Sequence, residues 1–353
     1  MNHRERFIEV MTFGKPDRLL VWQLFGFMPG ALERWMDEGM PAVKSPVEAF
    51  EFFGFDPQPV HAPADYGPIP KIENKIIEET EEYSIFTDDF GRTNKLIKSA
   101  STLPLPLDFP VKTMSDWEEW EQKFQFQPER VPDSWANSRK DLPVSLNFMG
   151  MYHFPRQLMG DLELSLAFYD QPELIRRILD TYTDLLIALG EAAMRQNEID
   201  AVFLGEDYAY RGGPMISPSM FREFLKPYYE KIIGFFRQRG VKIFAVDSDG
   251  RVDELIPLLL EVGVNCFYPF EAQAGNDISA VRAQYGKDLA IIGGINKMAI
   301  AAGKEAIDRE LDAKLPTMRA TGGYAASLDH RVTVETSFEN YVYYIEGVRR
   351  RLY

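Results

Sequence analysis

Residues 241–271 read VKIFAVDSDGRVDELIPLLLEVGVNCFYPFE and carry the clearest structural pattern in the chain. An apolar run at 241–246, rich in β-branched and aromatic residues, predicts a strand that stops at the polar turn DSDG, 247–250. Apolar residues then recur at helical spacing, and a second apolar run at 266–270 closes on Glu271. This strand–helix–strand order predicts two parallel strands whose carboxyl ends share three carboxylates. In α/β proteins that edge of the sheet is where ligands bind.

The same strand–helix unit recurs along most of the chain. Apolar runs predict eight strands, at 19–24, 57–61, 143–148, 201–204, 242–246, 266–270, 289–292 and 324–327. From the third strand onward helical patterns follow, at 172–195, 218–239, 253–262, 277–285, 304–320 and 336–351. Repeated alternation of this kind requires parallel strands, and eight units fit a closed barrel. We therefore predict an α/β protein with a single (β/α)8 TIM barrel spanning residues 1–353.

One segment departs from this alternation. Residues 72–97, IENKIIEETEEYSIFTDDFGRTNKLI, alternate polar and apolar side chains around the sequence DFG. Such alternation predicts a β-hairpin, which we place as an insertion in the N-terminal part of the barrel, at about 72–105. An acidic helix with two tryptophans, SDWEEWEQKF at 115–124, follows it.

Composition excludes several classes of function. The formal charge is −15, from 39 basic and 54 acidic side chains, and a field of that sign disfavours nucleic acid and anionic membrane surfaces. No apolar run approaches the roughly eighteen residues of a membrane span. The first eighteen residues carry charges throughout and lack a signal-peptide core. The one cysteine fits a reducing compartment. We expect a cytoplasmic protein without nucleic-acid or membrane partners, whose oligomeric state is open, a homodimer included.

The last residues of each predicted strand, and the first of the next loop, are candidates for a site at the barrel mouth. In chain order the main candidates are His153, Arg156, Glu206, Asp207, Tyr210, Arg211, Asp247, Asp249, Glu271, Asn296 and His330. The same edge includes His61, Asn147, Lys297, Asp329 and Arg331. Three of the four histidines belong to this set, more than an even scatter would give.

Two interpretations of the acidic positions stay open. Asp247 and Asp249 could simply surround a helix N-terminus, with Asp249 or Ser248 as its cap. They could also form a divalent-metal or proton-transfer site with His330. Glu206 and Asp207 could likewise belong to an acidic loop or to a ligand site, the latter favoured by the tyrosines and Arg211 that follow.

Five blocks of sequence, in order, resemble the uroporphyrinogen decarboxylase superfamily across nearly the whole chain. They are RERFIEVMTFGKPDR (4–18), ISPSMFREFLKPYYEKII (216–233), DSDGRVDELIPLLLEVGVNCFYPFE (247–271), IIGGIN (291–296) and TGGYAASLDHRVTVETSFENY (321–341). The resemblance implies a (β/α)8 barrel. It also implies one of two chemistries: decarboxylation of a porphyrinogen without a cofactor, or methyl transfer to or from a corrinoid held by a separate protein.

Departures from the family's motifs favour methyl transfer. Decarboxylases of the superfamily carry arginines just after the first strand, whereas 21–35 here read VWQLFGFMPGALERW, with no arginine before Arg34. His330 does match a decarboxylase histidine after the last strand. Thiol-methylating members hold zinc by His-x-Cys and a distant Cys, and these positions align with Asp247, Asp249 and His330. Soft ligands are thus replaced by harder ones, although a carboxylate–imidazole metal site remains open.

We therefore expect a corrinoid-protein-dependent methyltransferase that demethylates a small methylated compound of the methyl ether or methylamine type. Asp247, Asp249 and His330, with or without zinc, would supply the acid for the leaving group. The substrate would be held by His153, Arg156, Glu206, Asp207, Tyr210, Arg211, Glu271 and Asn296. One alternative is a carboxy-lyase that releases CO2 from a small anionic substrate gripped by Arg156, Arg211 or Arg331. Another is a non-catalytic barrel that binds a tetrapyrrole or corrinoid.

Overall fold

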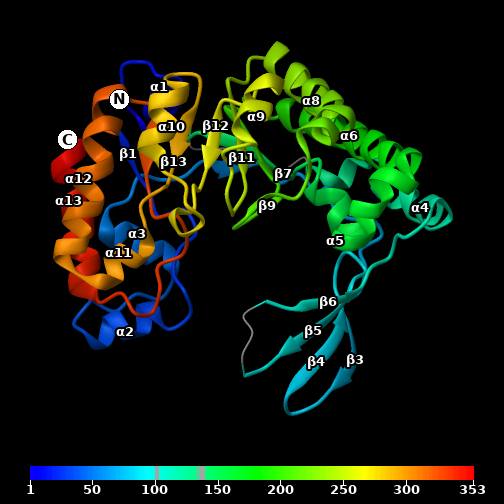
Figure 1. The fold of residues 1–353 in the computed structure, drawn as a ribbon, viewed down its shortest axis with the longest axis horizontal. Coiled ribbons are helices and arrows are strands. Elements are labelled where there is room, and N and C mark those ends of the chain that lie inside the picture. Colours follow the sequence, from blue (N-terminus) through cyan, green and yellow to red (C-terminus); the bar gives the residue numbers. More distant parts are fainter. Residues whose placement is uncertain (100–102, 133–134, 136–139) are drawn as a thin grey trace.

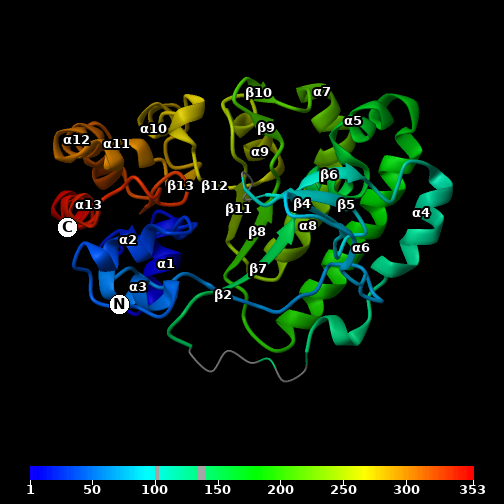
Figure 2. The same ribbon diagram turned by 90° about the horizontal axis from the view of Figure 1, so that it is seen from below.

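The computed structural model describes residues 1–99, 103–132, 135 and 140–353. Eight strands form one parallel sheet in the order β1-β14-β13-β12-β11-β8-β7-β2. These strands are β1 (Leu20–Val21), β2 (Val60–His61), β7 (Val144–Met149), β8 (Ala201–Gly205), β11 (Ile243–Asp247), β12 (Cys266–Tyr268), β13 (Ala290–Ile292) and β14 (Tyr324–Ala326). The sheet curls, and helices cover its outer side (Figures 1 and 2). The prediction of eight parallel strands in an α/β fold is confirmed.

The strand order is that of a (β/α)8 barrel opened between β1 and β2, which form the two ends of the sheet. Pro57 and Pro59 lack the amide hydrogens that a longer second strand would need, so β2 has only two residues. One main-chain hydrogen bond crosses this seam, from the amide of Asp56 to the carbonyl of Val21 over 3.0 Å, and side chains add two more. The Gln58 amide donates to the carbonyl of Gln23 over 3.1 Å, and the Asp56 carboxylate accepts from the amide of Val21 over 3.0 Å. The predicted closure of the barrel is therefore not seen in the described part of the chain.

Helices lie at each place where the strand–helix alternation predicts one, and at four further places. They are α1 (His3–Met11), α2 (Ala31–Asp37), α3 (Pro46–Phe53), α4 (Met114–Trp120), α5 (His153–Asp170), α6 (Pro172–Met194), α7 (Pro218–Met220), α8 (Lys226–Gln238), α9 (Ile256–Val262), α10 (Ile278–Tyr285), α11 (Lys297–Ala302), α12 (Lys304–Thr321) and α13 (Phe338–Leu352). Of these described helices, α2, α3, α5 and α11 were not predicted, and the start of α5 was treated as a loop. Of the helices described, none is both long and apolar enough to span a bilayer.

The inserted segment forms a four-stranded antiparallel sheet rather than a single hairpin. Its strands, in spatial order, are β3 (Lys75–Glu79), β4 (Tyr83–Thr87), β5 (Thr93–Ile97) and β6 (Leu105–Asp108). β6 was not predicted because Pro104 and Pro106 argue against a strand, although an edge strand tolerates prolines. The sheet projects from the body on the side where α2 and the short strand β9 (Ala209–Tyr210) lie (Figure 1).

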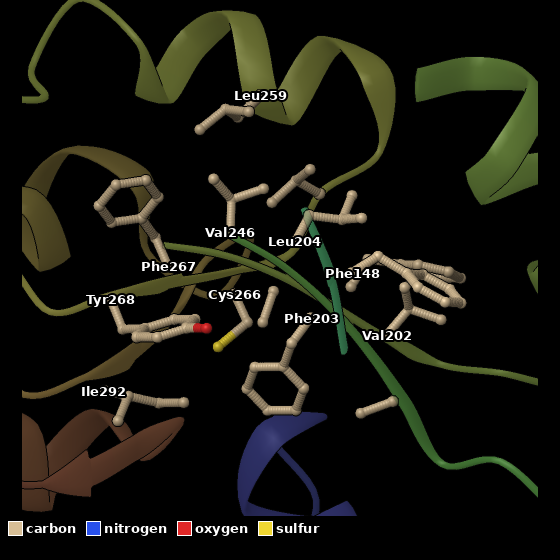
Figure 3. Packing of buried hydrophobic residues seen from close by; sticks show 14 of the residues in the cluster. Phe148, Val202, Phe203, Leu204, Val246, Leu259, Cys266, Phe267, Tyr268 and Ile292 are labelled. Carbon is tan, nitrogen blue, oxygen red and sulfur yellow. The ribbon is translucent and has the colours of Figure 1, made fainter. Parts of the chain in front are cut away.

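Side chains alternate across the central sheet and thereby set the direction of the site residues. Leu204, Val246 and Phe267 point toward Leu259 of α9, on the outer side (Figure 3). Phe203, Cys266 and Tyr268 point the opposite way, to the inside of the curl (Figure 3). Because successive residues of a strand face opposite sides, the residue after Val246 faces inward. That residue is Asp247.

Candidate active site

The end of β11 presents a carboxyl group to the inside of the curled sheet. Asp247 is in register with Gly205 of β8 and with Tyr268 of β12. No described residue donates a hydrogen bond to its side chain. Burial raises the pKa of Asp247 well above its ordinary value, and the nearby carboxylates of Asp249 and Asp207 raise it further. The raised pKa favours the protonated form of Asp247, the form that can act as a proton donor.

Asp249 lies two residues further on and faces His330. Its Oδ2 is 3.9 Å from Nε2 of His330, and its Oδ1 is buried without a hydrogen-bond partner among the described residues. Burial raises the pKa of Asp249 to about 6, with further contributions from Asp207 and Glu271. A buried oxygen without a partner has an unmet need for a donor. A ligand with a hydroxyl or amine hydrogen would supply one.

The hydrogen bonds of His330 establish which ring nitrogen carries its proton. Its Nδ1 accepts from the backbone amide of Arg331 over 2.8 Å. The neutral ring therefore carries its hydrogen on Nε2, the atom that faces Asp249. Burial lowers the pKa of His330, and the charges of Lys297 and Arg331 lower it further. His330 is thus a neutral N–H donor, and its ring centre lies 5.3 Å from that of Phe25.

Lys297 and Asp329 complete this side of the site, although the sequence assigned them no role. Asp329 is fully buried, and its carboxylate accepts from the backbone amides of Ala272 (2.9 Å) and Lys297 (3.0 Å). It therefore ties together the loops after β12, β13 and β14. The charge of Lys297 lowers the pKa of Asp249 and of Asp329. Lys297 is the cation within this acidic group.

Glu206, which the sequence analysis assigned to substrate, caps α5. Its carboxylate accepts from the amides of Met151 (2.7 Å), Tyr152 (2.9 Å) and His153 (2.9 Å), and from the hydroxyl of Tyr229. The side chain is fully buried. Burial raises its pKa to about 7, against the four hydrogen bonds that favour the charged form. Full burial and four protein donors make Glu206 a cap for α5, and its contact with substrate stays a prediction.

His153 is likewise engaged by the protein. Its Nδ1 lies 3.0 Å from the carbonyl of Glu206, and the side-chain amide of Gln157 contacts its Nε2. Burial lowers its pKa, so the ring is neutral. With both nitrogens in contact with the protein, His153 anchors the first turn of α5, and its contact with substrate stays a prediction.

Three further residues predicted to bind substrate lie near β8, and they differ in whether they pair with other side chains. Arg156 lies in α5 and pairs with Asp161 at 2.5 Å and with Asp207 at 3.5 Å. The guanidinium is therefore neutralised. Tyr210, the last residue of β9, is 60% exposed, and Arg211, in the turn between β9 and β10 (Gly213–Pro214), is exposed as well. These two side chains are free to meet a partner.

Glu271 and Asn296 shape the loops of the site. The Glu271 carboxylate accepts from the amide of Gly250 over 3.1 Å. Gly250 has φ +81°, and a Cβ there would lie 2.6 Å from the carbonyl carbon of Ala209, so only glycine fits at this crossing. Asn296 caps α11, because its Oδ1 accepts from the amide of Met298 over 2.9 Å.

A second polar cluster lies on β2 and β7. The hydroxyl of Ser145 donates to Oδ1 of Asn147 (2.9 Å) and lies 2.9 Å from Nδ1 of His61. The hydroxyl therefore accepts the Nδ1 hydrogen, which leaves Nε2 of His61 as an acceptor. Burial lowers the pKa of His61. The sequence predicted that His61 and Asn147 lie at the barrel mouth, but it did not predict that they contact each other.

The predicted metal site does not form in the arrangement described. Within residues 1–99, 103–132, 135 and 140–353, no three His, Cys, Asp or Glu side chains gather closely enough to hold one ion. Zinc normally has four ligands in tetrahedral geometry. Asp247, Asp249 and His330 thus fit a proton-transfer group better than a metal centre, and no step below uses a metal.

The raised pKa of Asp249 predicts how a substitution changes stability with pH. Its folded pKa of about 6 exceeds the ordinary 3.8, so its stabilising contribution is complete below about 3.8 and is lost as pH rises through 6. We expect Asp249→Asn to raise the melting temperature relative to the wild type at pH 8, with a gain that vanishes toward pH 4. Glu81→Gln, at an exposed turn, serves as the control without such a gain. A difference independent of pH would contradict the assignment.

Comparisons with known proteins identify the family and the fold of this chain. Residues 154–351, more than half of the chain, match the family model described as uroporphyrinogen decarboxylase (URO-D). A curated uroporphyrinogen decarboxylase of Cellvibrio japonicus (strain Ueda107) is 26% identical over 184 residues, or 51% of this chain and 49% of that protein. The match thus spans about half the length of this relative. A solved methyltransferase from Methanosarcina mazei superposes with a TM-score of 0.62 at 13% identity, covering 99% of each chain. At that identity the superposition shows a shared fold.

Proposed function

Because the chain belongs to the uroporphyrinogen decarboxylase family, we propose that it is a methyltransferase which demethylates a small methylated compound and passes the methyl group to a corrinoid on a partner protein. The observation that carries this proposal is the position of the Asp247 carboxyl, at the inner end of β11 beside Asp249 and Asp207, where burial and these carboxylates raise its pKa. A methyltransferase from Methanosarcina mazei shares the fold over the full chain. The loop after β1 is apolar here, which gives a polyanionic tetrapyrrole no cationic support.

Cleavage of a methyl ether needs a proton donor. When the methyl–oxygen bond breaks, its electron pair stays on the oxygen, and a proton from Asp247 converts the leaving group to an alcohol. The charge of Asp249 raises the pKa of Asp247, and the Asp249 carboxylate faces the Nε2 hydrogen of His330. These two groups would return a proton to Asp247 after each turnover. Lys297 would limit the charge that builds up on Asp249.

The corrinoid is the methyl acceptor in this proposal, and its reduced cobalt would supply the nucleophile. A partner that carries it would approach the edge of the sheet formed by the carboxyl ends of the strands. The exposed Tyr210 and Arg211 and the loop with Phe25 and Phe27 are the residues there that would meet it. Arg211 would suit the phosphate of a corrinoid side chain.

A second candidate, release of CO2 from a small anionic substrate, is supported by unpaired cations. In the described part of the chain, Arg211, Lys297 and Arg331 form no ion pair with a carboxylate, whereas Arg156 does. The curated relative is itself named uroporphyrinogen decarboxylase. Asp247 would then protonate the carbon left behind.

The test is methyl transfer to free, chemically reduced cobalamin as the acceptor. The purified chain is mixed with a series of methyl ethers and methylamines, and methylcobalamin is followed by its absorption spectrum. Formation that depends on both enzyme and donor would support the proposal. Absence of transfer from every donor, together with CO2 release from an anionic substrate in a parallel assay, would replace it by the lyase.

A further inference from the structure

A cavity of about 890 Å³ opens at the seam between β1 and β2, next to the candidate site. We call it the seam cavity. Four phenylalanines, Phe25, Phe27, Phe50 and Phe55, line it together with Val47 of α3 and Arg331. Its volume lies within the range of about 300–1,000 Å³ that is usual for small-molecule sites. A wall with this many aromatic rings matches a flat apolar ligand.

The cavity lies beside the seam at which the barrel does not close. A closed barrel has a ladder of main-chain hydrogen bonds between the first and second strands, whereas here one such bond is described, from the amide of Asp56 to the carbonyl of Val21. Here the prolines before Val60 shorten β2, and the side chains of Asp56 and Gln58 span the gap. Both of these residues, and Gln23, also line the cavity.

The charged groups at the wall define the ligand's charge. Arg331 is exposed and pairs with no carboxylate in the described residues. The carboxylate of Asp56 is occupied by the guanidinium of Arg18. Glu51 brings one further negative charge to the wall. Arg331 can pair with a single carboxylate of a ligand. The charge of Glu51 would repel a ligand that carries several negative charges.

Phe25 connects the seam cavity to the candidate active site. It lines the cavity, and its ring centre lies 5.3 Å from that of His330. Arg331, the next residue after His330, belongs to the same wall. A ring held in the cavity would therefore carry its substituents toward His330 and Asp249.

We infer that the seam cavity binds a small aromatic carboxylic acid, and that in the reaction proposed above this acid carries the methyl ether. The ring packs against the phenylalanines, and Arg331 holds the carboxylate. The second half of this inference rests on the proposed function, whereas the binding site itself does not.

Calorimetric titration with benzoate tests the site, because benzoate has no methyl group to transfer. Val47→Trp would fill the cavity from a side chain that is 63% exposed, so folding is preserved. We expect it to weaken benzoate binding at least tenfold. Arg331→Gln should weaken binding by about 10-fold through loss of a charge-assisted hydrogen bond. Phe52→Trp, on the same helix but outside the cavity, should leave binding unchanged. Trimethylamine, which has no ring, should not compete.

Two results would overturn the inference: no benzoate binding to the wild type, or binding that Val47→Trp leaves intact. Failure of the proposed function would look different. If benzoate binds as expected but 3-methoxybenzoate yields no methylcobalamin with reduced cobalamin, the aromatic-acid site stands and the methyl ether assignment falls.

Discussion

Replacing Asp247 by asparagine should slow methyl transfer by about 10²–10⁴-fold, the usual contribution of a general acid. The amide has the same shape but cannot release a proton to the leaving oxygen. Initial rates of methylcobalamin formation at pH 7 measure this effect. Asp253→Asn, which removes an exposed carboxylate paired with Arg251, should leave the rate unchanged.

The pH profile distinguishes loss of an acid from loss of structure. The wild-type rate should fall as pH rises through the elevated pKa of Asp247, because the donor is then deprotonated. In Asp247→Asn the residual rate should lose this alkaline limb. A variant that transfers methyl groups at the wild-type rate would remove Asp247 from the mechanism.

Replacing Glu206 by glutamine should reduce the free energy of unfolding by about 2–4 kcal/mol, because this buried carboxylate caps α5. In the wild type, backbone amides of α5 donate to the carboxylate. The side-chain NH2 of glutamine is itself a donor and cannot accept these hydrogen bonds. The helix start would lose its cap, and buried donors would lose their acceptor. Urea unfolding followed by circular dichroism measures the loss.

Tyr229→Phe is the matched comparison, because it removes one of the four donors to Glu206 and keeps the ring. It should cost about 1 kcal/mol, the net value of one hydrogen bond. Equal stability of Glu206→Gln and the wild type would show that Glu206 is not the cap, and would leave substrate binding as its predicted role.

The sequence predicted the strands well where apolar runs end at polar turns. The run before Asp247 became β11, and the register with β8 and β12 followed from parallel pairing. Closure failed at β2, since Pro57 and Pro59 remove donors that an apolar pattern does not reveal. At β6 the error was reversed, because the prolines argued against a strand that the structure contains.

The site was harder to predict, because its contacts join distant loops. No side-chain cap precedes α5, so the pattern at 150–153 gave no helix start. The cap comes from Glu206, more than fifty residues later. Glu206 and His153 therefore looked available for substrate when both are occupied. Lys297 and Asp329 were recognised only by position, since their charge interactions with Asp249 and His330 depend on how three strand ends meet.

The most direct test of the account is the ionisation state of Asp247 itself, which requires neither substrate nor partner. Difference infrared spectroscopy of the wild type against Asp247→Asn, across a pH titration, reports the protonated carboxyl band of this one residue. The account predicts that the band persists at pH 7, because burial and neighbouring carboxylates raise the pKa. A band lost near pH 4, the ordinary value of about 3.9 for aspartate, would contradict it.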